Sequence, residues 1–273
     1  MTKHITHSAF GKRLFFGRNK PKIIAPRLSL KNYLGKALPN PPPLWNWRRL
    51  AVPSLEQMYL NDAEGDCVIA ELAHATGVLT GNATNGVPLI LTNTQINALY
   101  SAIGGYVPGD PSTDNGCDIQ TALNYQGVNG LLPGSSNPHK IQGYLAVNPT
   151  DKVELQLALF LFENLCFGIE LPDSWVTPFP SVNNFVWGVA ESSNPGNGHS
   201  FLGYGYNSLG VPISTWALEG LITYDAIATY CAAVNQGELY TVISQDSLIR
   251  ATSRAPNGFN WTQLLADFNA IKG

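Results

Sequence analysis

The pattern of apolar residues changes at Cys166, and this change constrains the fold more than any other feature of the sequence. Before Cys166 apolar residues recur with helical spacing, whereas after it short aromatic or β-branched runs alternate with Gly, Pro and Asn. Helices followed by strands predict an α+β fold with two lobes and a cleft between them. The expected helices are 67–79, the segment from the Thr92–Gln95 capping box to Gly104, 118–125, 151–165, 224–233 and 261–271, and the expected strands are 167–171, 185–189, 199–206, 211–216 and 239–244.

A proline-rich segment over 38–43 separates a basic arm from an acidic body. Residues 1–49 contain eleven Lys or Arg and no acid, while the remaining 224 residues contain five Lys or Arg and all nineteen acids. We therefore expect these parts: a basic N-terminal arm over 1–37, the linker over 38–43, a two-lobed domain over 44–250 with a helical lobe at about 60–166 and a β lobe at about 167–245, and a C-terminal helix over 251–273.

The arm has three interpretations. It docks on its own acidic body or on another part of an assembly, it binds an anionic partner such as nucleic acid, or it is a targeting signal. Apolar residues are spread through the arm, among them Leu14, Phe16 and Leu30, and they favour packing of the arm on another surface. Because the arm contains no nucleic-acid-binding module, we rank nucleic-acid binding below docking. Residues 1–10 lack the apolar run of a secretory signal, so we expect a cytoplasmic or other intracellular protein, with organelle targeting left open.

Several other classes of protein are excluded. No apolar run reaches the roughly 18 residues that a membrane-spanning helix needs. The four cysteines, Cys67, Cys117, Cys166 and Cys231, form no CxxC pair, which argues against structural zinc and favours free thiols in a reducing compartment. No phosphate-binding loop, dinucleotide fingerprint or HExxH motif occurs, so no metal and no cofactor are expected.

Cys67 is the first candidate for chemistry. It begins a predicted helix, where the helix dipole and unpaired backbone N–H groups favour thiolate over thiol. Asn61, six residues earlier, is placed to supply an amide that binds an oxyanion together with the N–H of Cys67. The alternative is a small core cysteine that happens to begin a helix.

His199 is the histidine best placed to act as a base. It opens a predicted strand among small neighbours, and it lies 132 residues after Cys67. His74 is on the same helix as Cys67 but two turns away, roughly 10 Å along the axis, so we expect it to serve packing or to lie at the surface.

Several segments, in this order, make the chain resemble the papain-like cysteine peptidase superfamily over about residues 43–245. They are Leu44-Trp45-Asn46-Trp47-Arg48, Asn61, Gly65-Asp66-Cys67, Asn115-Gly116-Cys117 with Ala122 and Tyr125, Gly198-His199 with Gly203-Tyr204-Gly205-Tyr206, and Ser214-Thr215-Trp216.

The resemblance implies a fold, a chemistry and a set of roles. A helical lobe presents Cys67 as nucleophile across a cleft from His199 on the β lobe, with Asn61 as oxyanion donor and Ser214 in the place of the residue that orients the imidazole. Gly65, Asp66 and Trp216 are then expected to contact a peptide or protein substrate, with Trp216 shielding the contact between Ser214 and His199.

The chain departs from the family pattern at several points. The family has Asn where Ser214 stands and Gln where Asn61 stands, and Glu64 replaces a disulfide cysteine, so that Cys117 has no partner. The basic arm is also shorter than a papain-type propeptide and lacks its helical pattern.

Two functions follow from these observations. The first is a papain-like cysteine peptidase or a related thiol acyl-transfer hydrolase that uses Cys67 and His199. The second is a catalytically degenerate scaffold that acts as a binding or assembly protein through residues 1–37.

Overall fold

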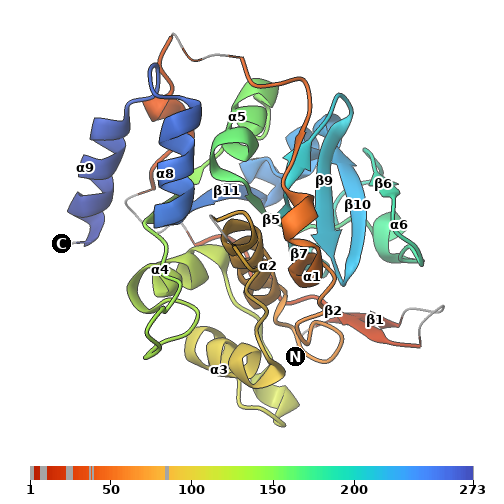
Figure 1. Ribbon diagram of the computed structural model, residues 1–273. Coiled ribbons are helices and arrows are strands. Elements are labelled where there is room, and N and C mark those ends of the chain that lie inside the picture. Colours follow the sequence, from red (N-terminus) through yellow and green to blue (C-terminus); the bar gives the residue numbers. More distant parts are fainter. Residues whose placement is uncertain are drawn as a thin grey trace.

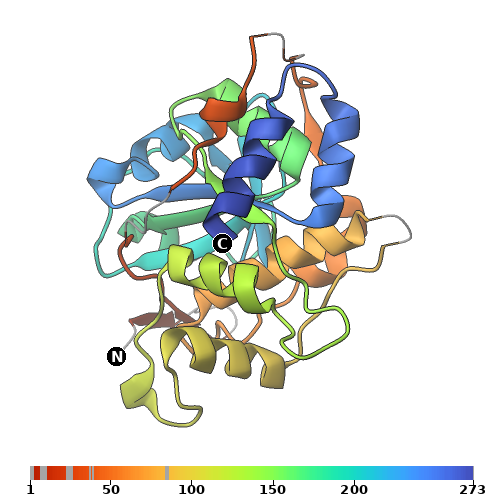
Figure 2. The ribbon, with the colours of Figure 1, turned by 90° about the vertical axis from the view of Figure 1, so that its left-hand side faces the viewer.

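The computed structural model describes residues 3–6, 11–22, 27–36, 38, 40–83 and 86–272. Helices dominate the first half of the body and a sheet dominates the second (Figure 1), as the sequence predicted. Helices α3 and α4 lie on the side of α2 that faces away from most of the sheet (Figure 2). The α+β class and the two-lobed arrangement are therefore confirmed.

The described residues form nine α-helices and eleven strands. The helices are α1 Val52–Leu55, α2 Cys67–Gly81, α3 Asn93–Gly104, α4 Ile119–Asn129, α5 Lys152–Phe162, α6 Asp173–Val176, α7 Tyr224–Tyr230, α8 Gln245–Arg254 and α9 Trp261–Lys272. The strands are β1 His4–Thr6, β2 Arg13–Phe15, β3 Trp45–Asn46, β4 Gly143–Ala146, β5 Leu165–Glu170, β6 Phe185–Trp187, β7 Gly198–Gly203, β8 Gly205–Tyr206, β9 Gly210–Thr215, β10 Leu218–Thr223 and β11 Glu238–Ile243.

One seven-stranded sheet organises the second half of the chain. Its strand order is β4-β11-β5-β7-β9-β10-β6, and every pairing is antiparallel except that of β10 with β6. Strand β7 is central, and α2 packs against it more extensively than any other helix packs on the sheet. The N-terminal end of α2 and the start of β7 are thereby held together, which fixes the two elements that carry Cys67 and His199.

Helix α2 is buried on nearly every side. All its residues except Thr80 are buried, so its burial does not depend on an amphipathic pattern. It lies in a core shared by both lobes, in which Cys67 and Leu72 pack with Leu202 of β7 and Tyr240 of β11. A helix enclosed in this way holds its first residue in a fixed position.

Local signals in the sequence predicted some element boundaries and missed others. The Thr92–Gln95 capping box and the stop at Gly104-Gly105 are confirmed. The expected helix 151–165 ends instead at Phe162, because Glu163 adopts a left-handed φ of 76° and the chain turns into β5. The single helix expected over 251–273 is wrong, because α8 begins at Gln245, ends at Arg254 and is followed by a separate α9.

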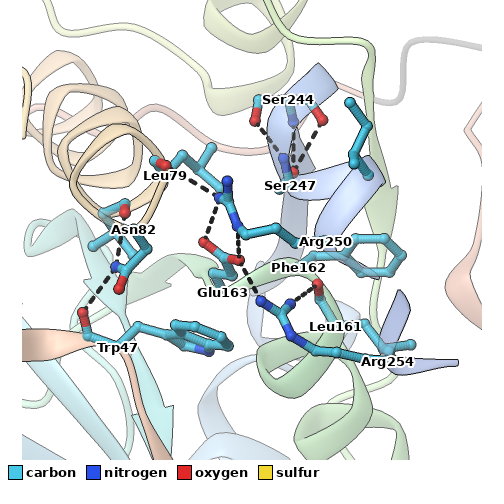
Figure 3. A network of polar contacts seen from close by, with 12 residues as sticks. Trp47, Leu79, Asn82, Leu161, Phe162, Glu163, Ser244, Ser247, Arg250 and Arg254 are labelled. Carbon is cyan, nitrogen blue, oxygen red and sulfur yellow. Dashed lines mark hydrogen bonds and ion pairs between the residues drawn. The ribbon is translucent and has the colours of Figure 1, made fainter. Parts of the chain in front are cut away.

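Glu163 joins the end of α5 to α8 and to the end of α2. Its buried carboxylate accepts hydrogen bonds from Arg250 Nε at 2.7 Å and Arg254 Nη2 at 3.0 Å (Figure 3). Arg250 also donates to the Leu79 carbonyl at 3.1 Å, and Arg254 donates to the Leu161 carbonyl at 2.9 Å. Two arginines on successive turns of α8 therefore fix this helix against the body.

We predict that Glu163→Gln lowers the free energy of unfolding by about 3 kcal/mol, because it leaves two mostly buried guanidinium groups without their counter-charge. Urea denaturation followed by circular dichroism measures the change. Glu56→Gln is the matched control, since the Glu56 side chain is 52% exposed and lies 3.9 Å from Arg48; we expect a change below about 0.5 kcal/mol there. Equal effects of the two substitutions would contradict this role of Glu163.

Candidate active site

Residues 15–19 of the arm, which we call the inserted segment, lie between the two lobes. The Phe15 N–H donates to the Asn61 carbonyl at 3.1 Å, and the Arg18 N–H donates to the Gly198 carbonyl at 3.1 Å. Cys117 pairs with the segment through both of its backbone groups, accepting from the Asn19 N–H and donating to the Gly17 carbonyl, each at 2.9 Å. The segment is thus bound through its main chain to the helical lobe and to β7.

Gly17 brings the inserted segment closer to the body than any side chain would allow. A Cβ atom on Gly17 would lie 1.7 Å from the Gly65 carbonyl oxygen, and a Cβ on Gly116 would lie 2.0 Å from the Gly17 carbonyl oxygen. Backbone atoms cannot yield as the end of a flexible side chain can. Glycine is therefore required on both sides of this contact.

Cys67 is the first residue of α2 and is 1% exposed. The backbone N–H groups of Gly17 and Ser200 donate to its thiol, which places the sulfur next to the residue that follows His199. Burial nevertheless raises the pKa of the Cys67 thiol to about 12. The low thiol pKa expected at a helix N-terminus is wrong for this arrangement, because desolvation under the inserted segment outweighs the two N–H donors.

His199 is equally enclosed. Its ring stacks on Trp216 with centroids 3.7 Å apart, and Phe16 of the inserted segment meets it edge-on at 6.1 Å. Its Nε2 is 2.8 Å from Thr215 Oγ1, and its buried Nδ1 has no hydrogen-bond partner among the described residues. Burial holds the pKa of His199 well below its usual range, so the imidazole is neutral.

The structure assigns the contact with the imidazole to Thr215 and not to Ser214. Ser214 Oγ donates to the Leu55 carbonyl at 2.7 Å and so joins β9 to α1. Neighbouring residues of a strand point to opposite faces, so only one of these two hydroxyls can reach His199. The placement of Ser214 beside the ring is therefore corrected, whereas Trp216 does lie over the ring as the sequence suggested.

Asn61, Gly65 and Asp66 form the turn that leads into α2. The Asn61 side-chain amide donates to the Phe15 carbonyl at 3.2 Å and to the Glu64 carbonyl at 3.1 Å. The Gly65 N–H donates to the carboxylate of Asp114 at 3.1 Å. Asp66 is buried, and burial together with the nearby Glu64 raises the pKa of its carboxyl. The amide expected to bind an oxyanion thus holds a carbonyl of the inserted segment.

His74 and Glu71 lie further along α2. His74 is buried, its ring centroid is 4.8 Å from that of Tyr59, and burial lowers its pKa to about 4, in agreement with a packing role. Sequence reasoning missed Glu71, whose carboxylate accepts from the Phe167 N–H and from Ser200 Oγ, each at 2.6 Å. An acid four residues after Cys67 in an apolar helix was the signal that could have found it.

No cluster of His, Cys, Asp and Glu in the described part of the chain could hold a metal ion. Within the same residues, none of the helices combines the length and the apolar character that a bilayer-spanning segment requires.

Comparison with known proteins identifies the fold. No protein-family model and no curated protein sequence matches the chain. Solved structures do match, among them xylellain, a cysteine protease from Xylella fastidiosa, at 16% identity and a TM-score of 0.61 over 89% of this chain and 98% of that one. Procathepsin L 3 from Tenebrio molitor matches at 16% identity and a TM-score of 0.54 over 83% of this chain and 76% of that one. The ragweed pollen cysteine protease Amb a 11, in its proform, matches at 14% identity and a TM-score of 0.58 over 77% of this chain and 69% of that one.

The chain therefore has the fold of the papain-like cysteine proteases. At these identities the match extends to the arrangement of helices and strands, which is the arrangement the sequence resemblance implied.

We predict that Thr215→Ala slows alkylation of Cys67 about tenfold or more once the inserted segment is displaced by Gly17→Val, because an imidazole without its partner is poorly oriented. Thr215→Ser, which keeps the hydroxyl, is expected to retain most of the rate. Peptide mapping by mass spectrometry measures the modification at Cys67. Ser214→Ala is the matched control, since it should lower thermal stability and change the rate less than about twofold. A larger loss of rate in Ser214→Ala than in Thr215→Ala would contradict the assignment.

Proposed function

We propose that this protein is a thiol acyl-transfer hydrolase, a papain-like cysteine peptidase, that is kept inactive by its own inserted segment. The observation that carries the proposal is that Cys67 begins α2 and that α2 packs against β7, the strand that carries His199. The thiol contacts the N–H of Ser200, and the imidazole is held by Thr215 with its Nδ1 free of other partners among the described residues.

The reaction follows from these positions. His199 Nδ1 accepts the proton of the Cys67 thiol, and the thiolate attacks the carbonyl carbon of a peptide bond. The Asn61 amide and the Cys67 N–H stabilise the oxyanion of the tetrahedral intermediate. The imidazolium then gives its proton to the leaving amine, and water hydrolyses the thioester to release the acid and restore the thiol.

The inserted segment opposes the first step of this reaction. It covers Cys67 and His199, and burial raises the pKa of the thiol while it lowers the pKa of the imidazole. Both groups are therefore neutral, and the charged pair that attacks a carbonyl is disfavoured. Displacing the segment admits water, which lowers the pKa of Cys67 and raises that of His199 toward their ordinary values.

The alternative is a non-catalytic scaffold that binds an acidic partner through the arm. Several described basic residues of the arm are already engaged with the body: Lys12 with Asp62 at 3.1 Å, Arg18 with Glu238 at 2.8 Å and Lys22 with Asp118 at 3.1 Å. These contacts support docking of the arm on its own chain. The four cysteines are free and buried, which supports an intracellular, reducing location.

We predict that Gly17→Val increases the rate of Cys67 alkylation by iodoacetamide at pH 8 roughly tenfold or more, because its side chain collides with the Gly65 carbonyl and lifts the inserted segment. The same variant is expected to hydrolyse fluorogenic peptides that the wild-type chain leaves intact. Mass spectrometry and fluorescence measure the two effects.

Two further variants complete this experiment. Asn19→Val places the same side chain at an exposed position of the segment and should leave the rate near that of wild type. Adding His199→Ala to Gly17→Val should remove peptide hydrolysis and most of the gain in alkylation. A Gly17→Val protein that alkylates no faster than wild type, or that is unaffected by His199→Ala, would overturn the enzymatic proposal in favour of the scaffold.

A further inference from the structure

We propose, building on the proposed peptidase function, that Glu71 is a positioning residue, which acts through Ser200 to hold a backbone N–H group against the sulfur of Cys67. Glu71 is the one acid of α2. Both of its hydrogen bonds go to strands of the sheet and not to the groups that react, so any effect it has on the reaction passes through β7.

Glu71 joins α2 to two neighbouring strands beside the site. It lies four residues after Cys67, about one helical turn, and is 1% exposed. Its carboxyl group accepts from the Phe167 N–H of β5 and from Ser200 Oγ of β7, each at 2.6 Å. Because β5 and β7 are paired at Gly168 and Ser200, one side chain fixes both strands to the helix that begins at Cys67.

Ser200 directs two of its groups toward α2. Its hydroxyl donates to the carboxyl group of Glu71, and its backbone N–H donates to the Cys67 thiol. Ser200 also follows His199 directly in β7, so a displacement of Ser200 moves the N–H donor and the base together. The bond between Ser200 and Glu71 therefore fixes the position of this N–H relative to the sulfur.

The N–H of Ser200 is the donor that stays with the thiol when the inserted segment leaves. In the closed chain the sulfur accepts from the N–H groups of Gly17 and Ser200. Gly17 departs with the inserted segment, whereas Ser200 belongs to the central strand of the sheet. A hydrogen bond to a thiolate favours the charged form, so the open site relies on Ser200 for this stabilisation.

The contacts of Glu71, and not a negative charge, make it suited to this position. Burial raises the pKa of the Glu71 carboxyl well above its usual range, although the bonds from Ser200 and Phe167 oppose the rise. A charge at Glu71 would disfavour the thiolate of Cys67, whereas the neutral acid does not. Glutamine has nearly the same shape, and since a serine hydroxyl can accept as well as donate, glutamine can keep both contacts.

The test compares variants of the full Gly17→Val chain, in which the inserted segment is displaced. Glu71→Leu and Ser200→Ala each remove the bond between Glu71 and Ser200. We expect each to reduce the fraction of Cys67 present as thiolate at pH 7 about tenfold, and Glu71→Gln to keep that fraction within about twofold. The pH dependence of alkylation by iodoacetamide, with peptide mapping at Cys67, measures the thiolate.

Thr76→Val is the matched control. Thr76 is another buried polar residue of α2, and its hydroxyl accepts from Gln126 Nε2 of α4 at 3.0 Å, away from β7. We expect Thr76→Val to lower Tm about as much as Ser200→Ala does and to leave the pH profile of alkylation unchanged. The other titratable groups around the sulfur are present in every variant: Asp66, Cys117 and His199.

Peptide hydrolysis provides a second readout in the same background. We expect Glu71→Leu to lower kcat for a fluorogenic peptide about tenfold, because less of Cys67 is thiolate. KM is expected to change less than about twofold, since Glu71 is buried within the body and bonds to the sheet. Glu71→Gln should restore kcat.

The outcomes separate this role from the proposed function. If Glu71→Leu and Ser200→Ala kept the pH profile of the Gly17→Val parent while alkylation still depended on His199, the role of Glu71 would be overturned and the proposed function would stand. If hydrolysis were absent and His199→Ala had no effect, the proposed function would fail, while a raised thiol pKa in both variants would still support the role of Glu71.

Two further results would count against the inference. A change in the pH profile of Thr76→Val as large as that in Ser200→Ala would show a general loss of structure in its place. An effect of Glu71→Gln as large as that of Glu71→Leu would show that the contacts alone are not what matters. Should Glu71→Leu fail to fold, Ser200→Ala decides the question, because it leaves the bond from Phe167 to Glu71 in place.

Discussion

The contact between the backbones of Gly17 and Gly65 is the constraint on which the state of the site depends. Because Gly17 has no side chain, the arm lies directly against the turn that leads into α2. This close approach brings the Gly17 N–H to the Cys67 thiol and Phe16 to the His199 ring. The same contact therefore closes the site and sets the neutral state of both reactive groups.

Buried carboxylates held by arginines recur at two places in the molecule. Glu238 accepts Arg18 of the arm, and Glu163 accepts Arg250 and Arg254 of α8. In both cases a segment outside the two lobes is fixed to them by a charge that would be costly to leave unpaired. Positive charge is concentrated in the first 49 residues, and among the described residues part of this charge is neutralised by ion pairs with acids of the body.

Local patterns predicted the elements that carry the candidate catalytic residues. The helical spacing of apolar residues over 67–79 indicated a helix, and the short run after Gly198 indicated a strand; both elements are present. The assignment of the orienting hydroxyl failed because it depends on which side chain of β9 lies on the same face of the sheet as His199 of β7, and that side chain is Thr215. Spacing along the sequence cannot resolve a choice between adjacent residues of a strand.

Contacts between distant residues lay beyond local patterns altogether. Arg18 and Glu238 are separated by 220 positions, and nothing near either residue indicates the other. The arm's composition left self-docking, nucleic-acid binding and targeting open, since positive charge alone suits all three. The roles of Cys67, His199, Asn61, Gly65, Asp66 and Trp216 in catalysis or substrate binding remain predictions that the fold supports.

The most direct test of this account is the titration of the Cys67 thiolate, followed by its ultraviolet absorbance, in the wild-type and Gly17→Val chains. Cys67→Ser variants of each supply the blank for the other three buried thiols. The account predicts no thiolate at Cys67 below about pH 9 in the wild-type chain, where burial raises its pKa to about 12, and a titration shifted down toward the ordinary thiol pKa of about 8.5 in Gly17→Val. Identical titrations in the two chains would contradict the claim that the inserted segment controls the site.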